Sequence, residues 1–365
     1  MKILYVMPVA FHGGAEKIVV SLADHMVSKG HQVVVVALKG PIKMQSKGIQ
    51  IQELGLSNIL KLPFSFFKLL LIYYRFKPDI VHSHIIYSHL FCRFAKFFYF
   101  KKHILFSSEH CTITNAKIGF FKKILFKITN FLSDNIYNVS NEGVCSYEKE
   151  NLVSIGQMKC IYNGVDLEKF KIVNQIYSKS DFLGQEHDLL FLAVGRLHFQ
   201  KDYINLLEAL TYYKKKFNSK FKCLIVGEGP QEQILKQKCA DFGILDNVDF
   251  LGVRNDVNYL MKLCDVYILS SLFEGLPTVL IEALSSPCLI ASTDCGGSKE
   301  ILDGITDVVP VQNPIELSNK INALVNLSNV DKRILLEKSS QKAEELFSDK
   351  TMKHNWYKEY LDHVS

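Results

Sequence analysis

The sequence has no long apolar stretch. Charged side chains interrupt every apolar run of this 365-residue chain before about 18 residues, the shortest length that crosses a bilayer as a helix. The opening residues are apolar only as far as Phe11 and then break at Gly13-Gly14, without a small-residue cleavage site. They therefore predict a first β-strand rather than a secretory signal. These absences indicate a globular, cytoplasmic protein.

The sequence also lacks the cysteine pattern of a disulfide framework and the cysteine or acid motifs of a metal site. The nine cysteines are odd in number and include no C-x-x-C pair, which favours reduced thiols in a cytosol. No D-x-D occurs either. His82 and His84 share one strand face, as two metal ligands could, but no Cys or acid at a suitable spacing accompanies them. We expect them to line a substrate site or to pack at a strand end.

The chain has enough apolar material for two cores. Its composition, 48% apolar and 22% charged, suits a soluble globular protein of two domains. Short β-branched runs alternate with longer helix-like segments, as in parallel sheets that are covered by helices on both faces. The predicted strands are Ile3–Met7, Gln32–Ala37, Asp79–His82, Ile104–Ser107, Asn135–Val139, Leu189–Val194, Cys223–Val226, Val248–Leu251, Val266–Ser270, Leu289–Ser292 and Val308–Pro310. This pattern predicts an α/β fold of two doubly wound, Rossmann-like domains.

A polar, weakly patterned stretch separates the two halves. We expect an N-terminal domain of residues 1–170, a linker of residues 171–187 and a C-terminal domain of residues 188–345. Residues 346–365 carry aromatic side chains at helical spacing, which predicts a terminal helix that packs back toward the N-terminal domain. Ligands of such sheets bind at the carboxyl ends of the strands, so two facing domains imply a cleft between them.

Positive charge is unevenly distributed along a chain of net charge +6. Residues 1–170 carry 21 Lys and Arg against 11 Asp and Glu, whereas the remainder carries 22 against 26. Lys122, Lys123 and Lys127 would form the basic face of an amphipathic helix, which suits an anionic membrane surface. The same pattern fits helices that cover a sheet and keep their lysines in water. Nucleic acid is not expected, because no recognition motif accompanies the charge.

The segment FEGLPTVLIE, residues 273–282, holds two glutamates around a predicted helix start. It follows the strand-like VYILSS and therefore lies at the carboxyl end of a strand. Pro277 suits the first turn of a helix, and Gly275 permits a tight entry. Glu274 and Glu282 would flank an anion site without sharing a proton. On the plainer interpretation both are solvated helix carboxylates.

Groups that suit phosphate follow two predicted strands. Gly195 and Arg196 come directly after LLFLAV, and Lys201 lies five residues beyond Arg196. Arginine offers a fork and lysine a point charge to phosphate oxygens. Free backbone amides at the helix start would add uncharged donors. The amides expected to be free are those of Leu276, Thr278 and Val279.

Two further loops fit the same ligand. Gly14 in HGGAEK follows the first strand and allows close approach of a phosphate or an acceptor. Val253 and Arg254 follow FLG and are placed to face a nucleotide base. The first loop is not G-x-G-x-x-G, which weakens a dinucleotide interpretation. A nucleotide sugar, with its sugar, two phosphates and ribose, has the layout that these groups require.

In order and content, these motifs resemble those of the family-4 retaining glycosyltransferases over nearly the whole chain. The motifs are HGGAE, SSEHC (107–111), YNGVD (162–166), GRL followed by Lys201, GEGP, FLG and the E-x₇-E block. E-x₇-E alone is moderately specific, whereas the ordered set is highly specific. The resemblance implies the GT-B fold, with an acceptor-binding N-terminal domain and a C-terminal domain that binds the nucleotide sugar.

The resemblance also implies roles for individual residues. Glu274 matches the acid that contacts the donor-sugar hydroxyls and the reacting centre, and Glu282 matches the one that binds the ribose hydroxyls. Arg196 and Lys201 match the pair that neutralises the leaving diphosphate. His110 matches a histidine at the donor sugar. The implied donor-binding set is Gly14, Gly195, Arg196, Lys201, Val253, Arg254, Glu274, Gly275, Leu276, Pro277, Thr278, Val279 and Glu282; Asn141 and Asn163 match less specific motifs.

The implied activity is that of a hexosyltransferase in the synthesis of cell-surface polysaccharide or glycoconjugate. It would move a sugar from a nucleotide sugar, by family frequency a UDP-sugar, to a glycan or a lipid-linked glycan. Retention in this family is described as front-face attack in which the leaving phosphate assists deprotonation of the acceptor, so the glutamates need not act as a paired acid and base. No metal cofactor is implied. Peripheral contact with the inner face of the cell membrane is expected.

Two other functions remain open. An NAD-dependent oxidoreductase uses a similar sheet, although the glycine fingerprint of that class is absent. A non-catalytic protein that binds a nucleotide sugar would share the fold. The presence of Glu274, Glu282, Arg196, Lys201 and His110 favours an enzyme over such a protein.

Overall fold

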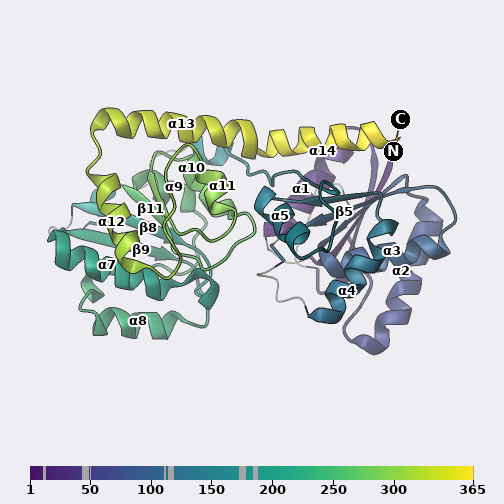
Figure 1. The fold of residues 1–365 in the computed structure, drawn as a ribbon, viewed down its shortest axis with the longest axis horizontal. Coiled ribbons are helices and arrows are strands. Elements are labelled where there is room, and N and C mark those ends of the chain that lie inside the picture. The colour runs from purple at the N-terminus through teal and green to yellow at the C-terminus, as the bar shows by residue number, and fades with distance from the viewer. Residues whose placement is uncertain are drawn as a thin grey trace. The chain divides into compact units, whose positions relative to one another are not determined.

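The chain divides into two compact units, each a sheet surrounded by helices (Figure 1). The computed structural model describes residues 1–10, 14–42, 49, 51–110, 112–113, 119–171, 178–183 and 188–364. The first unit is Met1–Gly164 with Lys350–Ser365, and the second is Val165–Asp349. The stretch interpreted as a linker, 171–187, therefore belongs to the second unit, and part of it lies outside the described residues.

The first unit holds a parallel sheet in the order β3-β2-β1-β4-β5-β6-β7. Its strands are β1 Lys2–Val9, β2 Gln32–Lys39, β3 Ile51–Glu53, β4 Ile80–His84, β5 Ile104–Glu109, β6 Asn135–Asn138 and β7 Met158–Cys160. The five predicted strands are confirmed. Strands β3 and β7 are not among the predicted ones, because three residues at a sheet edge leave no recognisable apolar pattern.

Helices cover both faces of this sheet. They are α1 Gly14–Ser28, α2 Leu62–Phe76, α3 Ile85–Phe98, α4 Phe120–Thr129, α5 Asn141–Lys149 and α14 Asp349–Val364, with short 3₁₀ turns η1 Ile59–Lys61 and η2 Asn130–Leu132. Alternate residues of the central strands pack against α1 and α14 on one face and against α2 and α3 on the other. Since successive side chains of a strand point to opposite faces, the VVVVA run of β2 supplies both cores.

The second unit holds a parallel sheet in the order β10-β9-β8-β11-β12. Its strands are β8 Leu189–Val194, β9 Phe221–Val226, β10 Val248–Phe250, β11 Val266–Leu269 and β12 Leu289–Ser292. The predicted strand Val308–Pro310 is wrong, because this segment makes only an isolated bridge between Val309 and Thr293. A proline at its end supplies no N–H to extend the pairing.

Helices of the second unit are α6 Glu168–Lys171, α7 Tyr203–Phe217, α8 Glu232–Asp241, α9 Val257–Leu263, α10 Thr278–Leu284, α11 Ser298–Leu302, α12 Pro314–Val325 and α13 Asn329–Phe347, with 3₁₀ turns η3 Lys179–Asp181, η4 Phe199–Lys201 and η5 Leu245–Asn247. Phe191 and Ala193 of β8 pack with Cys223 and Ile225 of β9 against α7, α8 and α12. Each large side chain so buried contributes about 1.5–3 kcal/mol. This core fixes the strands whose carboxyl ends carry the candidate site.

The last helix, α14, belongs to the core of the first unit. Its buried side chains Met352, Trp356 and Tyr360 pack with Phe106 of β5 and Tyr137 of β6. Tyr137 donates a hydrogen bond to Glu359 of the same helix, and Lys159 lies 2.9 Å from that carboxylate. Within the described ranges, no helix has both the length and the apolar character needed to cross a membrane.

Candidate active site

Loops at the carboxyl ends of β8 and β9 pack backbone against backbone in the second unit. Gly195 N donates to Val226 O at 2.9 Å, and Leu197 N donates to Glu228 O at 2.9 Å. Gly227 has φ +139°, and a Cβ there would overlap the carbonyl oxygen of Gly195. The glycines of GEGP are therefore required by the close approach of two loops. The same approach holds the loop that begins at Gly195.

An ion pair lies at the centre of these loops. Lys201 Nζ is 2.7 Å from Glu274 Oε1, and the two side chains are only 17% and 13% exposed. Ser271 Oγ donates to the same carboxylate oxygen at 3.0 Å. Gln200 Nε2 lies 3.4 Å from Glu274 Oε2 and donates to Phe273 O at 2.9 Å. The two candidate residues that the sequence separates by 73 positions are thus held together.

The backbone of Glu274 is fixed by the loop that follows β12. Glu274 N donates to Cys295 O at 2.5 Å, and Glu274 forms a parallel bridge with Gly296. Gly296 has φ +110°, and a Cβ on it would overlap the carbonyl oxygen of Glu274. Gly297 N donates to Gly275 O at 3.2 Å. The D-C-G-G sequence therefore positions the acidic residue, a role that the sequence did not reveal.

Unpaired backbone donors follow the ion pair directly. Within the described part of the chain, no hydrogen bond takes the amides of Leu276, Thr278 and Val279. Pro277 was expected in the first helical turn but lies one residue before α10, with an extended ψ of 98°. This geometry leaves three N–H groups available to an acceptor next to Lys201.

Glu282, the second glutamate of the block, lies on α10 and is half-buried. Its carboxylate and that of Glu274 both act on the buried hydroxyl of Tyr267. The pKa of Tyr267 is raised well above its usual value by burial first, then by Tyr203 and by the two carboxylates. No hydrogen-bond partner for the Tyr267 hydroxyl occurs among the described residues. Burial and these neighbouring groups therefore all disfavour ionisation of the Tyr267 phenol.

The remaining cations of the site differ in their partners. Arg196 is exposed, and its guanidinium makes no ion pair with any described residue. Arg254 instead donates from Nε to Asp256 Oδ1 at 2.8 Å and from Nη2 to Asp256 Oδ2 at 2.5 Å. These hydrogen bonds lower the pKa of Asp256. Arg196 is therefore a free cation, whereas Arg254 is neutralised beside the exposed Val253.

A histidine cluster ends β4 and β5 in the first unit. His110 Nε2 lies 3.0 Å from His84 Nδ1, and His82 bonds Tyr360 at 2.5 Å and Ser108 at 2.7 Å. Burial lowers the pKa of His110 to about 4 and those of His82 and His84 well below the usual value. All three imidazoles are therefore neutral at pH 7. No three His, Cys, Asp or Glu side chains of the described residues converge on a metal position.

The opposite face of β5 carries a buried charge cluster. Glu109 Oε1 lies 3.1 Å from His89 Nε2, and both side chains are buried. The buried Arg93 donates to Ser133 Oγ at 2.8 Å and to Phe126 O at 3.1 Å. Burial lowers the pKa of Arg93 to about 10, and Glu109 opposes that shift. This cluster directly underlies the strand that presents His110.

The other predicted positions of the first unit lie on segments other than α3 and β5, which carry that cluster. Gly14 begins α1, and a Cβ on it would meet open space, so close packing does not explain this glycine. Asn141 begins α5 and donates to Tyr162 OH at 2.8 Å, and Asn163 is buried. The neighbouring motif residues His12, Gly13 and Cys111 lie outside the described residues.

Comparison with known proteins identifies the family. Residues 178–345 match the family described as Glycosyl transferases group 1, and residues 12–169 match Glycosyltransferase Family 4. The structure of HepE from Anabaena, in complex with UDP and glucose, has a TM-score of 0.83 to this one at 18% identity and covers 99% of this chain and 100% of its own. The chain belongs to the GT-B glycosyltransferases.

Relatives of this glycosyltransferase come from bacterial glycan synthesis. An α-1,4-N-acetyl-D-galactosaminyltransferase of Campylobacter jejuni, whose name gives the substrate as a trisaccharide on PP-undecaprenol, is 26% identical over 98% of each chain. The capsular polysaccharide biosynthesis glycosyltransferase CapH of Staphylococcus aureus is 25% identical over 85% of this chain and 87% of its own. A glycosyltransferase structure from Rickettsia africae has a TM-score of 0.82 at 20% identity, with 99% and 98% covered. The names of the first two relatives refer to a lipid-linked glycan and to a capsular polysaccharide.

The close approach of the loops predicts a stability difference between two glycine variants of the glycosyltransferase. Gly227→Ala forces a Cβ into the Gly195 carbonyl at positive φ, whereas Gly243→Ala, at φ +69°, meets open space. We expect Gly243→Ala to cost about 1 kcal/mol for backbone strain and Gly227→Ala clearly more, about 2–3 kcal/mol. Urea unfolding of both variants measures the difference, and equal losses would contradict the packing argument.

The histidine cluster predicts that the glycosyltransferase loses stability in mild acid. In the unfolded chain these imidazoles bind protons below a pKa of about 6.5, whereas in the folded chain they resist protonation. The unfolded state therefore binds more protons, and the free energy of unfolding falls as the pH drops from about 6.5 toward 4. His110→Asn should reduce this slope by up to about 1.4 kcal/mol per pH unit. Replacing the exposed His354 by Asn is the control, and equal slopes in all three proteins would contradict the prediction.

Proposed function

We propose that this glycosyltransferase is a retaining hexosyltransferase that moves a sugar from a UDP-sugar to a lipid-linked glycan. The names of two relatives, from Campylobacter jejuni and Escherichia coli, give substrates on undecaprenol diphosphate, and HepE was solved with UDP and glucose. Those ligands belong to the relatives. They support a donor and an acceptor of the same classes for this chain.

The proposal depends above all on the Lys201–Glu274 pair beside the free amides. A departing nucleoside diphosphate needs positive charge and N–H donors where its negative charge develops. Lys201, the unpaired Arg196 and the amides that begin with Leu276 supply both kinds of group within one set of loops. Without a donor, the Lys201 ammonium is paired with the Glu274 carboxylate. When a donor binds, the ammonium must therefore interact with both the carboxylate and the phosphate. Glu274 is then available to the sugar hydroxyls.

The chemical step is a substitution at the anomeric carbon. The bond from that carbon to the diphosphate oxygen breaks, and a bond to the acceptor oxygen forms on the same face. The proton of the acceptor hydroxyl passes to the departing phosphate, so no side chain has to act as a general base. His110 is neutral at pH 7, so any part that it plays is that of a hydrogen-bonding group rather than of a cation. The anomeric configuration of the product, measured by NMR, tests retention.

We also propose that no metal cofactor takes part. Two protein cations, Lys201 and Arg196, carry the charge that a divalent ion would otherwise neutralise. Turnover should therefore be unchanged after dialysis against a chelator, and recovery of lost activity by a divalent ion would contradict this part of the proposal.

A ligand panel tests the donor class. UDP-, GDP- and ADP-sugars and NAD are each added to the protein, and its thermal unfolding is followed. A ligand at 100 times its dissociation constant stabilises the folded state by about 2.7 kcal/mol. We expect stabilisation by UDP-sugars, none by NAD, and release of UDP only when acceptor or water can take the sugar. Binding without any turnover would favour the alternative of a non-catalytic nucleotide-sugar-binding protein.

The last part of the proposal is that the protein binds peripherally to the inner face of the membrane. Helix α4 exposes the side chains of Phe121 (85%) and Ile128 (59%). Lys127 lies on the same helix and makes no ion pair with a described residue. Lys122 and Lys123 are engaged, with Tyr87 OH at 2.5 Å and Glu150 Oε2 at 2.7 Å. Aromatic and basic side chains together favour an anionic bilayer surface. Unchanged co-sedimentation with anionic liposomes after Lys122, Lys123 and Lys127→Glu would contradict this placement.

A further inference from the structure

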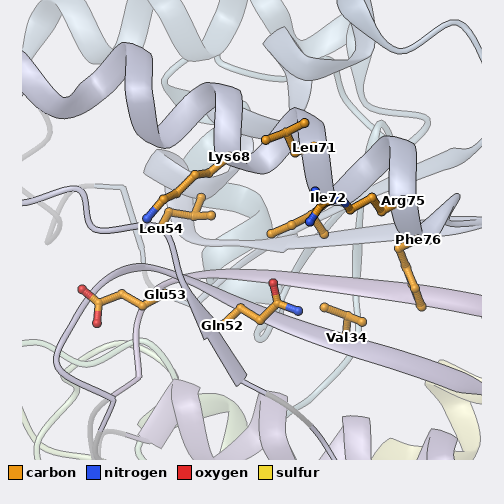
Figure 2. A pocket seen from close by; sticks show the side chains of 9 residues that line it. All are labelled: Val34, Gln52, Glu53, Leu54, Lys68, Leu71, Ile72, Arg75 and Phe76. Atoms are coloured by element: carbon orange, nitrogen blue, oxygen red, sulfur yellow. The ribbon is translucent and has the colours of Figure 1, made fainter.

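A groove lies along α2 at the β3 edge of the first sheet, and none of the residues discussed so far as donor contacts lines it. It has a volume of about 480 Å³, which is within the range of small-molecule sites. Figure 2 shows α2 on one side of it and the strands on the other, with Ile72 of α2 opposite Gln52 of β3. Apolar side chains such as Val34, Ile72 and Phe76 form much of its wall.

Two cations on one face of α2 reach into this groove. Lys68 and Arg75 are separated by seven residues, about 10 Å along the helix axis. Neither makes an ion pair with a described residue, although Lys68 Nζ lies 4.9 Å from the ring centroid of Phe64. The Gln52 amide lies across the groove between them (Figure 2). The three groups together can surround an anion of two phosphates, which Arg binds as a fork and Lys as a point charge.

One acid lines the groove without cancelling this charge. The Glu53 carboxylate lies against Gly40, where a Cβ would overlap it, and it forms no ion pair with Lys68. The groove therefore keeps two cations against one displaced carboxylate. An anionic group suits it better than a neutral sugar or a cation does.

The groove is continuous with an exposed apolar stripe on the same helix. Leu71 lines the groove and is itself 53% exposed, in line with the exposed Phe64, Phe67 and Tyr74 at helical spacing. An occupant could therefore place its polar part between Lys68 and Arg75 and leave along an apolar surface. This combination fits an amphiphile with a diphosphate head and a single hydrocarbon chain.

We infer that this groove binds the polyprenyl diphosphate portion of the lipid-linked acceptor. The inference rests on the proposed function for the acceptor class, and it adds where the lipid end is held. Arg75, Lys68 and Gln52 hold the diphosphate, and Leu71, Ile72 and Phe76 contact the first prenyl units. The site would anchor the acceptor on the same unit that carries His110.

Farnesyl diphosphate is a water-soluble probe of this site. Calorimetric titration of the full chain compares it with farnesol, which lacks the head, and with inorganic diphosphate, which lacks the chain. We expect farnesyl diphosphate to bind at least about tenfold more tightly than either, because charged hydrogen bonds and apolar contacts then act together. Equal affinity for inorganic diphosphate would overturn the amphiphile assignment.

A charge variant and a matched control separate the groove from general attraction. Lys68→Ala/Arg75→Ala should weaken farnesyl diphosphate binding at least about tenfold, since both charge-assisted contacts are lost. Lys101→Ala/Lys102→Ala removes the same charge from exposed positions of the same unit outside the groove and should leave binding unchanged. Equal weakening in both variants, or none in either, would overturn the proposal.

Kinetics distinguish failure of this inference from failure of the proposed function. In Lys68→Ala/Arg75→Ala the KM for a lipid-linked acceptor should rise at least about tenfold, while kcat and stabilisation by UDP remain unchanged. An unchanged KM overturns the groove assignment and leaves the transferase proposal standing. Specific probe binding in a protein without any UDP-sugar turnover supports the groove and removes the proposed activity instead.

Discussion

In a Lys201→Ala variant, turnover should fall at least about 100-fold, as expected when one group that stabilises transition-state charge is lost. Lys201 is the cation closest to Glu274, and its removal leaves that carboxylate largely buried without its charge partner. Both effects act where the diphosphate departs, so kcat should fall rather than the donor KM rise alone. Initial rates at saturating donor and acceptor measure the effect. Arg196→Ala should lower kcat to a similar extent.

A lysine elsewhere in the second unit provides the control. Lys236 forms an exposed ion pair with Glu232 on α8, at 2.7 Å. Lys236→Ala removes the same charge and ion-pair type but should leave kcat unchanged, because exposed pairs contribute little. Wild-type rates in both Lys201→Ala and Arg196→Ala would remove the proposed site. A normal thermal transition in Lys201→Ala is needed to show that its loss is catalytic.

Arg93→Met should lower the free energy of unfolding by about 3–5 kcal/mol, the usual cost of leaving a buried charge uncompensated. Arg93 is fully buried and connects α3 to the end of α4 through Phe126 O and Thr129 Oγ1, both at 3.1 Å. Its guanidinium also lies 4.6 Å from the ring centroid of Phe126. Methionine fills similar space but provides no donors, and it leaves Glu109 buried beside a neutral imidazole. Urea unfolding at neutral pH measures the loss.

Another cation on the same helix gives the comparison. Lys96 lies one turn further along α3 in a partly exposed ion pair with Asp134, at 2.7 Å. Lys96→Met should cost no more than about 1 kcal/mol. The double variant Arg93→Met/Glu109→Gln should recover part of the loss, because no buried charge then lacks a partner. A loss in Arg93→Met as small as that of Lys96→Met would contradict the buried-charge argument.

The candidate site could be predicted from the sequence where a motif contains its own chemistry. The E-x₇-E block and the G-R-x-x-x-x-K segment named Glu274, Arg196 and Lys201, and the structure brings Lys201 and Glu274 into contact. The supporting groups could not be predicted in the same way. Gln200 and Ser271 hold the Glu274 carboxylate, yet in the sequence they are ordinary polar residues of loops. Gln200 and Ser271 can hold that carboxylate only because the fold brings loops from different strands together.

The strands of the fold likewise include some that the sequence predicts and some that it does not. Short continuous apolar runs such as those of β2 and β8 were predictable, because a strand buried on both faces needs them. The three-residue edges β3 and β7 were not, since few of their side chains are buried. The histidines were recognised but not their arrangement: His84 contacts His110 because β4 and β5 are neighbours, with His84 in register with Ser108.

Helix α14 delays completion of the first unit during synthesis. Tyr5 and His82 are made 355 and 278 residues before Tyr360, the residue whose hydroxyl is their hydrogen-bond partner. Until then a nascent chain of more than 340 residues carries an open aromatic surface on its first sheet, where Trp356 and Tyr360 belong. Any truncation or fusion that keeps α14 from docking should therefore leave this aromatic surface uncovered.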